Sequence, residues 1–68
     1  MKKLRNAIVK AIAEGEKAIA ANDAAREAAY VADITNAELK LKLMCLDVER
    51  STIWSTIDKL HDALAQLA

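Results

Sequence analysis

The second half of this 68-residue sequence carries apolar side chains at alternating intervals of three and four residues. The series consists of Leu39, Leu43, Leu46, Ile53, Ile57, Leu60, Leu64 and Leu67. This is the spacing of positions a and d of a heptad repeat, which share one face of an α-helix. Arg50 is the one charged residue in the series. Because the chain also has no proline and a single glycine, the sequence predicts an all-α protein.

The same heptad register continues backwards into the first half, where it contains mostly small residues. Position d holds Leu4, Ala11, Ala18, Ala25 and Ala32, and position a holds Ile8, Gly15, Asn22, Ala29 and Asn36. Small side chains let two helix backbones approach closely. Ile12 and Ile19 lie beside this line and widen the apolar stripe to what a core-facing helix needs. The first half is therefore predicted to be a helix that packs against the second.

A helix start is marked between the two halves. Thr35 and Glu38 have the spacing of a capping box. Helices over about residues 2–32 and 36–67, joined by a turn at about 33–36, are nearly equal in length, as an antiparallel hairpin requires. The sequence therefore favours a single domain made of a two-helix antiparallel hairpin.

Three alternatives stay open at this stage. Asn36 is another candidate cap for the second helix. Asn22 and Asp23 are able to cap a middle helix, which gives a three-helix bundle in place of the hairpin. The heptad register also never slips between the halves, which permits one unbroken helix.

A second apolar stripe lies on the face away from the heptad seam. It consists of Tyr30, Ile34, Ala37, Leu41, Met44 and Val48, with Cys45 beside it. One partner helix cannot cover both faces of residues 39–48, so the second stripe must meet a second copy, a different protein or solvent. A homodimer that forms a four-helix bundle is the simplest closure. We expect the stripe to form an oligomer or partner interface together with Trp54, for which a core position is the other interpretation.

The chain is short for a stable core and has few means of reinforcing one by itself. Cys45 is the only cysteine, so no internal disulfide forms, and with the single histidine, His61, it cannot supply the four ligands of a structural zinc site. A partner chain is the remaining source of burial. A lone cysteine, no secretory leader and no membrane-spanning apolar run indicate a cytoplasmic protein, with Cys45 packed as a small core residue.

No arrangement typical of an enzyme is present. His61 lies between Asp58 and Asp62, and Asp58 and His61 have the acid-x-x-histidine spacing that some bundle proteins use for paired metals. This spacing occurs once, near the end of the sequence, and has no glutamate nearby. The sequence also lacks a glycine-rich phosphate loop and a serine–histidine–aspartate set. We expect no catalysis, no cofactor and no bound metal, and we interpret His61 as a solvated side chain.

A row of lysines indicates an alternative partner. Lys3, Lys10 and Lys17 are seven residues apart, although the net charge is zero, with ten basic and ten acidic side chains. In architecture, not in sequence, the predicted hairpin resembles the Rop family of plasmid copy-number proteins, helical-hairpin dimers that bind RNA through helix faces. This resemblance implies a Rop-like nucleic-acid binder, with the lysine row on phosphates, as the alternative function.

Arg50 and Asn22 break the apolar rule of the seam. A buried charge is costly unless it is paired, so Arg50 is expected to lie where the seam opens or to meet an acid such as Asp47 or Glu49, or one on the facing helix. Asn22 and Arg50 lie at similar distances from the turn. We therefore hypothesise that they face each other and fix the register of the helices.

The leading functional hypothesis is a small non-enzymatic protein-binding module that acts as an adaptor, regulator or inhibitor of a larger protein. It follows from apolar surface that a hairpin cannot cover and from the lack of visible chemistry. Small stand-alone inhibitors of this kind are common among phages and mobile elements. A purely structural oligomerisation segment is the third hypothesis.

Overall fold

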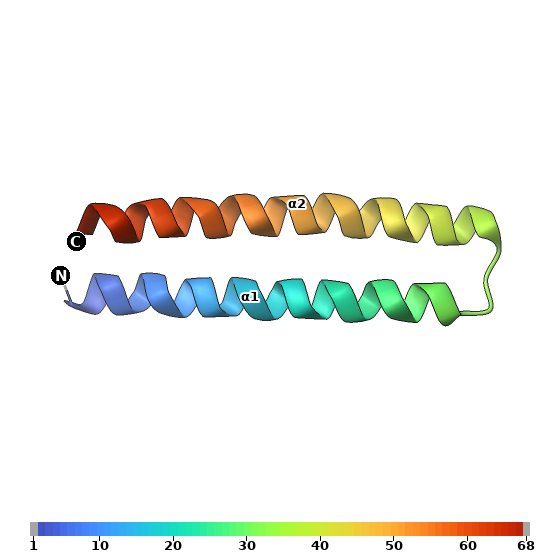
Figure 1. Ribbon diagram of the computed structural model, residues 1–68, viewed down its shortest axis with the longest axis horizontal. Helices are drawn as coiled ribbons and strands as arrows, with labels where there is room; N and C mark the ends of the chain where they lie inside the picture. Colours follow the sequence, from blue (N-terminus) through green and yellow to red (C-terminus); the bar gives the residue numbers. More distant parts are fainter. Residues whose placement is uncertain (1, 68) are drawn as a thin grey trace.

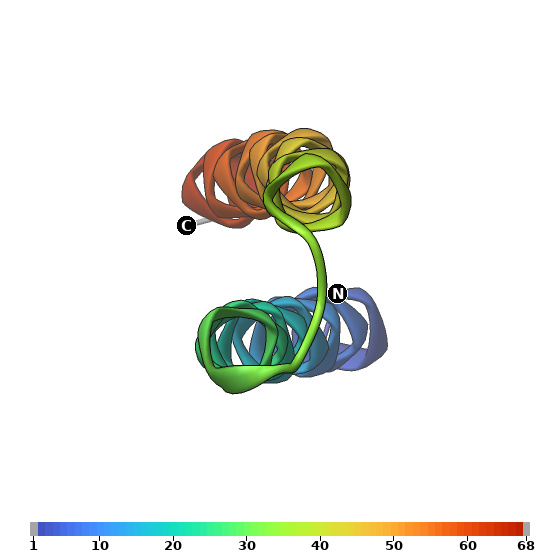
Figure 2. The same ribbon diagram turned by 90° about the vertical axis from the view of Figure 1, so that its right-hand side faces the viewer.

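The computed structural model of the chain describes residues 2–67, which form two long helices. Helix α1 spans Lys2–Val31 and helix α2 spans Asn36–Leu67. The helices run side by side in opposite directions, with the start of α1 and the end of α2 at the same end of the molecule (Figure 1). Seen from the turn, they remain two separate rods that are inclined to each other (Figure 2). The predicted antiparallel hairpin is confirmed, and its extents of 51 × 14 × 11 Å show that it is one helix pair thick.

Thr35 caps the start of α2. Its hydroxyl accepts a hydrogen bond from the backbone N–H of Glu38 at 3.2 Å, and its carbonyl accepts one from the N–H of Leu39 at 3.0 Å. This is the N-cap half of the predicted capping box. In the connection that follows α1, the N–H of Ile34 donates to the carbonyl of Ala32 at 3.0 Å. No residue between 2 and 67 has a positive φ, so the turn needs no left-handed cap.

The alternatives to the hairpin are wrong. Asn22 and Asp23 lie inside α1, which continues through them without a break, so no third helix forms. The connection at 32–35 also excludes one unbroken helix. Both side chains at 22 and 23 instead make contacts with α2, as described below.

α2 presents the predicted seam to α1. Ile57 is 2% exposed, and every other seam position from Leu39 to Leu67 is half-buried. Ala63 is the one further residue of α2 that is not exposed within the described range. The burial of this helix therefore follows the heptad spacing of its leucines and isoleucines.

α1 is rotated from its predicted orientation. Its buried residues are Ile12, Ile19, Asn22 and Ala29. The line of small residues expected at the seam lies to one side, so that Leu4, Ala25 and Ala32 are exposed and Ala11 and Ala18 are half-buried. An isoleucine side chain buries more apolar area than an alanine, so the helix turns its isoleucines toward α2. Of the expected seam residues, Asn22 and Ala29 at position a are buried, whereas position d is exposed or half-buried.

Gly15 lies where Ile57 packs against α1. A Cβ atom at residue 15 would come within 2.7 Å of Cγ1 and 3.0 Å of Cδ1 of Ile57, well inside the normal contact distance between carbon atoms. The φ of Gly15 is not positive, so backbone conformation does not demand this glycine. It is required by the close approach of the two helices.

We therefore expect Gly15→Ala to lower the free energy of unfolding by about 1 kcal/mol. Alanine improves helix propensity by about 1 kcal/mol, but overpacking typically costs about 1–3 kcal/mol. Because χ1 of Ile57 is restricted, its side chain cannot easily turn away from the new Cβ atom. Urea unfolding followed by circular dichroism measures the change. In an Ile57→Ala background the clash is absent and the same substitution should stabilise the fold. Equal destabilisation in both backgrounds would contradict this explanation.

Candidate interaction surfaces

A polar contact crosses the helix interface near its middle. Asn22 is 1% exposed, and its Nδ2 group donates to the carbonyl of Leu46 at 2.9 Å and to Oε1 of Glu49 at 3.4 Å. Its Oδ1 is buried and accepts no hydrogen bond from the described residues. A buried acceptor without a partner costs about 1–3 kcal/mol. Asn22 therefore weakens the seam while it ties α1 to one level of α2.

Two ion pairs join the helices close to Asn22 in the sequence. Asp23 pairs with Arg50, and Arg26 pairs with Asp47. Each helix supplies an aspartate and, three residues later, an arginine, so the antiparallel direction brings each aspartate to the arginine of the other helix. The hydrogen bond to Asp47 raises the pKa of Arg26 above its ordinary value. All four side chains remain partly solvated, so the pairs contribute more to register than to stability.

These contacts decide the two expectations for polar seam residues. Arg50 meets an acid on the facing helix, Asp23, which was one of its expected partners. Asn22 and Arg50 are not hydrogen-bonded to each other among residues 2–67, because Asn22 donates to Leu46 and Glu49 instead. The two residues therefore do not pair directly, although each bonds to a sequence neighbour of the other, and their role in fixing the register stays a prediction.

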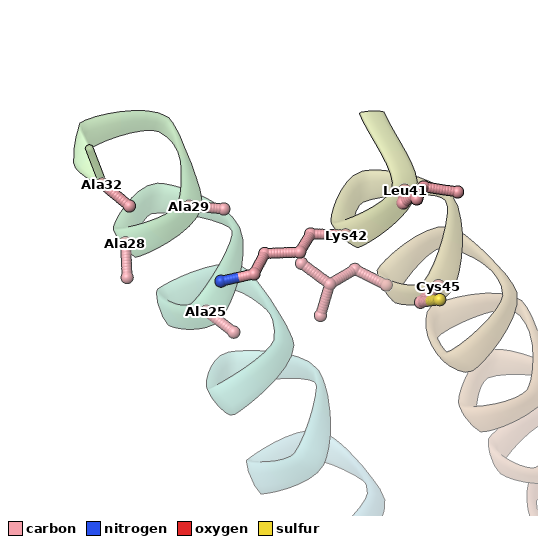
Figure 3. Close-up of a pocket in the computed structure, with 8 residues that line it drawn as sticks. Ala25, Ala28, Ala29, Ala32, Leu41, Lys42 and Cys45 are labelled. Carbon is pink, nitrogen blue, oxygen red and sulfur yellow. The ribbon is translucent and has the colours of Figure 1, made fainter. Parts of the chain in front are cut away.

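An open groove of about 590 Å³ runs between the helices near the turn. Its lining consists of Ala25, Ala28 and Ala29 from α1, Ala32 from the connection, and Leu41, Lys42, Cys45 and Leu46 from α2. Figure 3 shows the short alanine side chains on the α1 wall and the side chain of Lys42 extending from α2 toward α1. Apart from Lys42, the side chains that line this groove are apolar.

A second groove of about 560 Å³ lies further from the turn. Its lining consists of Ala11, Glu14, Gly15 and Ala18 from α1 and Thr52, Ile53, Thr56, Ile57 and Leu60 from α2. The two grooves lie on the same side of the hairpin because their linings share heptad positions. We call this surface the groove side; its edge residues are Ala11, Ala18 and Ala25 on α1, Ala32 just after α1, and Lys42 and Thr56 on α2. Glu49 lines neither groove but shares the heptad position of Lys42 and Thr56, so it belongs to the same edge.

The second apolar stripe is uncovered in the hairpin. Leu41 is 62% exposed, Met44 is 56% exposed and Val48 is 69% exposed. The heptad positions of all three face away from α1, although Leu41 also borders the groove near the turn. We call these three residues the outer face of α2. Because α1 packs against the opposite side of the helix, no other element among the described residues shields them.

The remaining residues of the expected interface are also accessible. Tyr30 is 60% exposed and Trp54 is 44% exposed, so Trp54 is not a core side chain of the hairpin. Ile34 is half-buried beside the turn. Cys45 is exposed, so the expectation that it packs in the core is wrong for the single hairpin. Its seam neighbour Leu46 takes the position that faces α1, and Cys45 lies one residue around the helix.

The charged candidates lie on the surface. Lys3, Lys10 and Lys17 are all exposed, and the amine of Lys17 forms an ion pair with Glu14 at 3.8 Å. His61 is exposed, as are its neighbours Asp58 and Asp62. Across residues 2–67, no three histidine, cysteine, aspartate or glutamate side chains are grouped so that they could hold a metal ion.

Neither α1 nor α2 has an apolar stretch long enough to cross a membrane. No protein-family model matches the chain, and no curated protein or solved structure shows significant similarity to it.

The groove side is the surface that sequence reasoning missed. A signal for it exists in the sequence, because Ala11, Ala18, Ala25 and Ala32 recur every seven residues. From the sequence alone, we expect these alanines in the seam between α1 and α2. The structure places Ile12 and Ile19 there instead and leaves the alanine line beside the seam, where it forms one wall of both grooves.

Proposed function

We propose that this chain is a non-enzymatic protein-binding module that acts as an adaptor, regulator or inhibitor of a larger protein. The observation that carries the proposal is the outer face of α2, where three large apolar side chains are each more than half exposed. Full burial of such a side chain contributes about 1.5–3 kcal/mol, so a helix or groove of another protein gains substantially by covering them. A cytoplasmic setting, in which Cys45 stays a thiol, is part of the proposal.

Self-association into a homodimeric four-helix bundle is the second part of the proposal. The hairpin exposes 5255 Å² of surface, whereas a compact folded monomer of 7.4 kDa exposes about 4,200 Å². The excess of about 1,000 Å² is comparable to the roughly 800 Å² per partner that a stable interface buries. Among residues 2–67, only four apolar residues are buried in the single hairpin, namely Ile12, Ile19, Ala29 and Ile57, so a second copy supplies the burial that it lacks.

The test of protein binding is capture from a host lysate with a matched pair of variants. Val48→Asp places a charge on the outer face of α2 and should abolish capture of the partner, because the carboxylate would be buried without a counter-charge. Ser55→Asp places the same charge one heptad further along the same side of α2, and should leave capture unchanged. Mass spectrometry identifies and quantifies the captured protein.

Three results would count against protein binding. Capture that survives Val48→Asp, or that Ser55→Asp abolishes equally, would show that the outer face does not carry it. A dimer that captures no protein would indicate a structural oligomerisation segment. Salt-dependent retention of RNA or DNA, lost on replacing Lys3, Lys10 and Lys17 with glutamine, would indicate the Rop-like nucleic-acid function instead.

A further inference from the structure

We infer that the second copy of the chain packs against the groove side, antiparallel to the first, about a two-fold axis at the level of Asn22 and Glu49. This inference rests on the self-association proposed above and adds which surface is buried and how the copies are oriented. It leaves most of the outer face of α2 available for a different protein.

The two sides of the hairpin differ in what a partner would have to desolvate. One side carries the ion pairs Asp23–Arg50 and Arg26–Asp47, and covering it would remove four charged groups from water. The groove side carries the alanine line of α1 and exposes parts of the half-buried Leu46 and Ile53, which line the two grooves. The groove side also carries charged side chains, Lys42 and Glu14 in the two linings with Glu49 between them, but these are fewer than the four ion-paired groups. Its burial is therefore the less costly and the more favourable choice.

The groove side also has the shape that close packing of helices needs. Ala11, Ala18, Ala25 and Ala32 present no side chain longer than a methyl group along the wall of both grooves. Small residues allow two helix backbones to approach closely, and a second hairpin then fills the groove volume with its own side chains. A dimer in this arrangement completes the burial of Leu46, Ile53 and Leu60, as the core layers of a four-helix bundle require.

Charge decides the relative direction of the two copies. Asn22 and Glu49 are in contact, so they mark one level along the hairpin. Lys42 lies seven residues from Glu49 toward the turn, and Glu14 lies eight residues from Asn22 in the other direction, which places them about 10 Å and about 12 Å on opposite sides of that level. A two-fold axis that lies between the two groove sides at that level, perpendicular to the helices, reverses the direction of the second copy. It brings Lys42 of each copy to the level of Glu14 of the other.

The parallel alternative lacks this complementarity. A two-fold axis along the hairpin brings each groove to the same groove of the second copy, so that Lys42 lies at the level of Lys42 and Glu14 at the level of Glu14. Like charges in such proximity are destabilising. The antiparallel arrangement brings only Glu49 close to its own copy, near the axis.

The buried surface is tested by two neighbouring alanines of α1. Ala25→Glu puts a carboxylate on the groove side. It should raise the dissociation constant of the dimer, measured by sedimentation equilibrium, about a hundredfold. Ala24→Glu puts the carboxylate on the adjacent exposed position, which lines neither groove, and should leave the dissociation constant unchanged. Both positions are exposed in the hairpin, so the helix content measured by circular dichroism should be the same in both variants.

The orientation is tested by exchanging charges. Glu14→Lys and Lys42→Glu should each weaken the dimer about tenfold, and the double variant should recover the original dissociation constant. Glu16→Lys makes the same charge change on an exposed residue that lines neither groove, and should have little effect. Glu49→Gln should tighten the dimer, because it removes the repulsion near the axis.

The outcomes separate this inference from the proposal on which it rests. A wild-type chain that sediments at 7.4 kDa at all concentrations overturns self-association, and the inference with it. A dimer that is insensitive to Ala25→Glu but dissociated by Val48→Asp overturns the groove side and assigns self-contact to the outer face of α2. A dimer sensitive to Ala25→Glu that shows no recovery in the double charge exchange overturns the antiparallel orientation.

Discussion

Ile57→Ala is expected to lower the free energy of unfolding by about 3 kcal/mol, the largest loss from any single truncation in this chain. Ile57 is 2% exposed and is the most buried apolar side chain of the hairpin. Its Cγ1 and Cδ1 atoms fill the space that Gly15 leaves open, so their removal creates a cavity at the closest approach of the helices. In so small a core, a loss of this size removes much of the total stability.

Urea unfolding at a fixed chain concentration measures the effect, since self-association makes apparent stability depend on concentration. Val48→Ala is the control, because it also shortens a β-branched residue of α2 but at a side chain that is 69% exposed. That control should change the free energy of unfolding by less than about 0.5 kcal/mol. Similar losses for the two substitutions would show that Ile57 is not the centre of the core.

Asn22→Leu is expected to raise the free energy of unfolding by about 2 kcal/mol. Leucine branches at Cγ as asparagine does and is somewhat larger, so we expect it to fill the buried space of Asn22, which is 1% exposed. The substitution removes the unpartnered Oδ1 atom and adds apolar burial, while Glu49, which is exposed, returns to water. Replacing a poorly satisfied polar group by an apolar one of the same shape is commonly stabilising.

The matched control is Asn22→Ala. Alanine also removes the amide but leaves a cavity that leucine would fill, so this variant should be less stable than the wild type. Adding Arg50→Leu to Asn22→Leu removes both polar residues from the seam. This double variant should be more heat-stable than the wild type but less uniform in oligomeric state, since polar seam residues restrict register and partner number. Unchanged melting temperature and stoichiometry would refute a role of these residues in specificity.

Local features predicted the helices and their order. The spacing from Leu39 to Leu67 identified the buried face of α2, because each position depends only on the period of one helix. The Thr35 cap gave the start of α2, because a cap bonds within its own first turn. The second apolar stripe was recognisable for the same reason, and the hairpin leaves it exposed.

The rotation of α1 was not predictable in the same way. The first half carries two adjacent lines, one of alanines and one with Ile12 and Ile19, and either satisfies the heptad period. Which line is buried depends on what α2 presents to it. The ion partner of Arg50 was not predictable for the same reason. Both helices carry aspartates or glutamates that could pair with it, and only the register of the packed helices selects Asp23.

The sequence by itself determined two helices, a turn before Thr35 and an apolar excess on α2, since these follow from periodicity and capping within single segments. Only the tertiary structure decided that Ile57 packs on Gly15, that Asn22 bonds to Leu46, and that the alanine line borders two grooves. The physical reason is that the rotation and register of one helix against another are set by contacts between residues distant in sequence, where side-chain volume and hydrogen bonding act together.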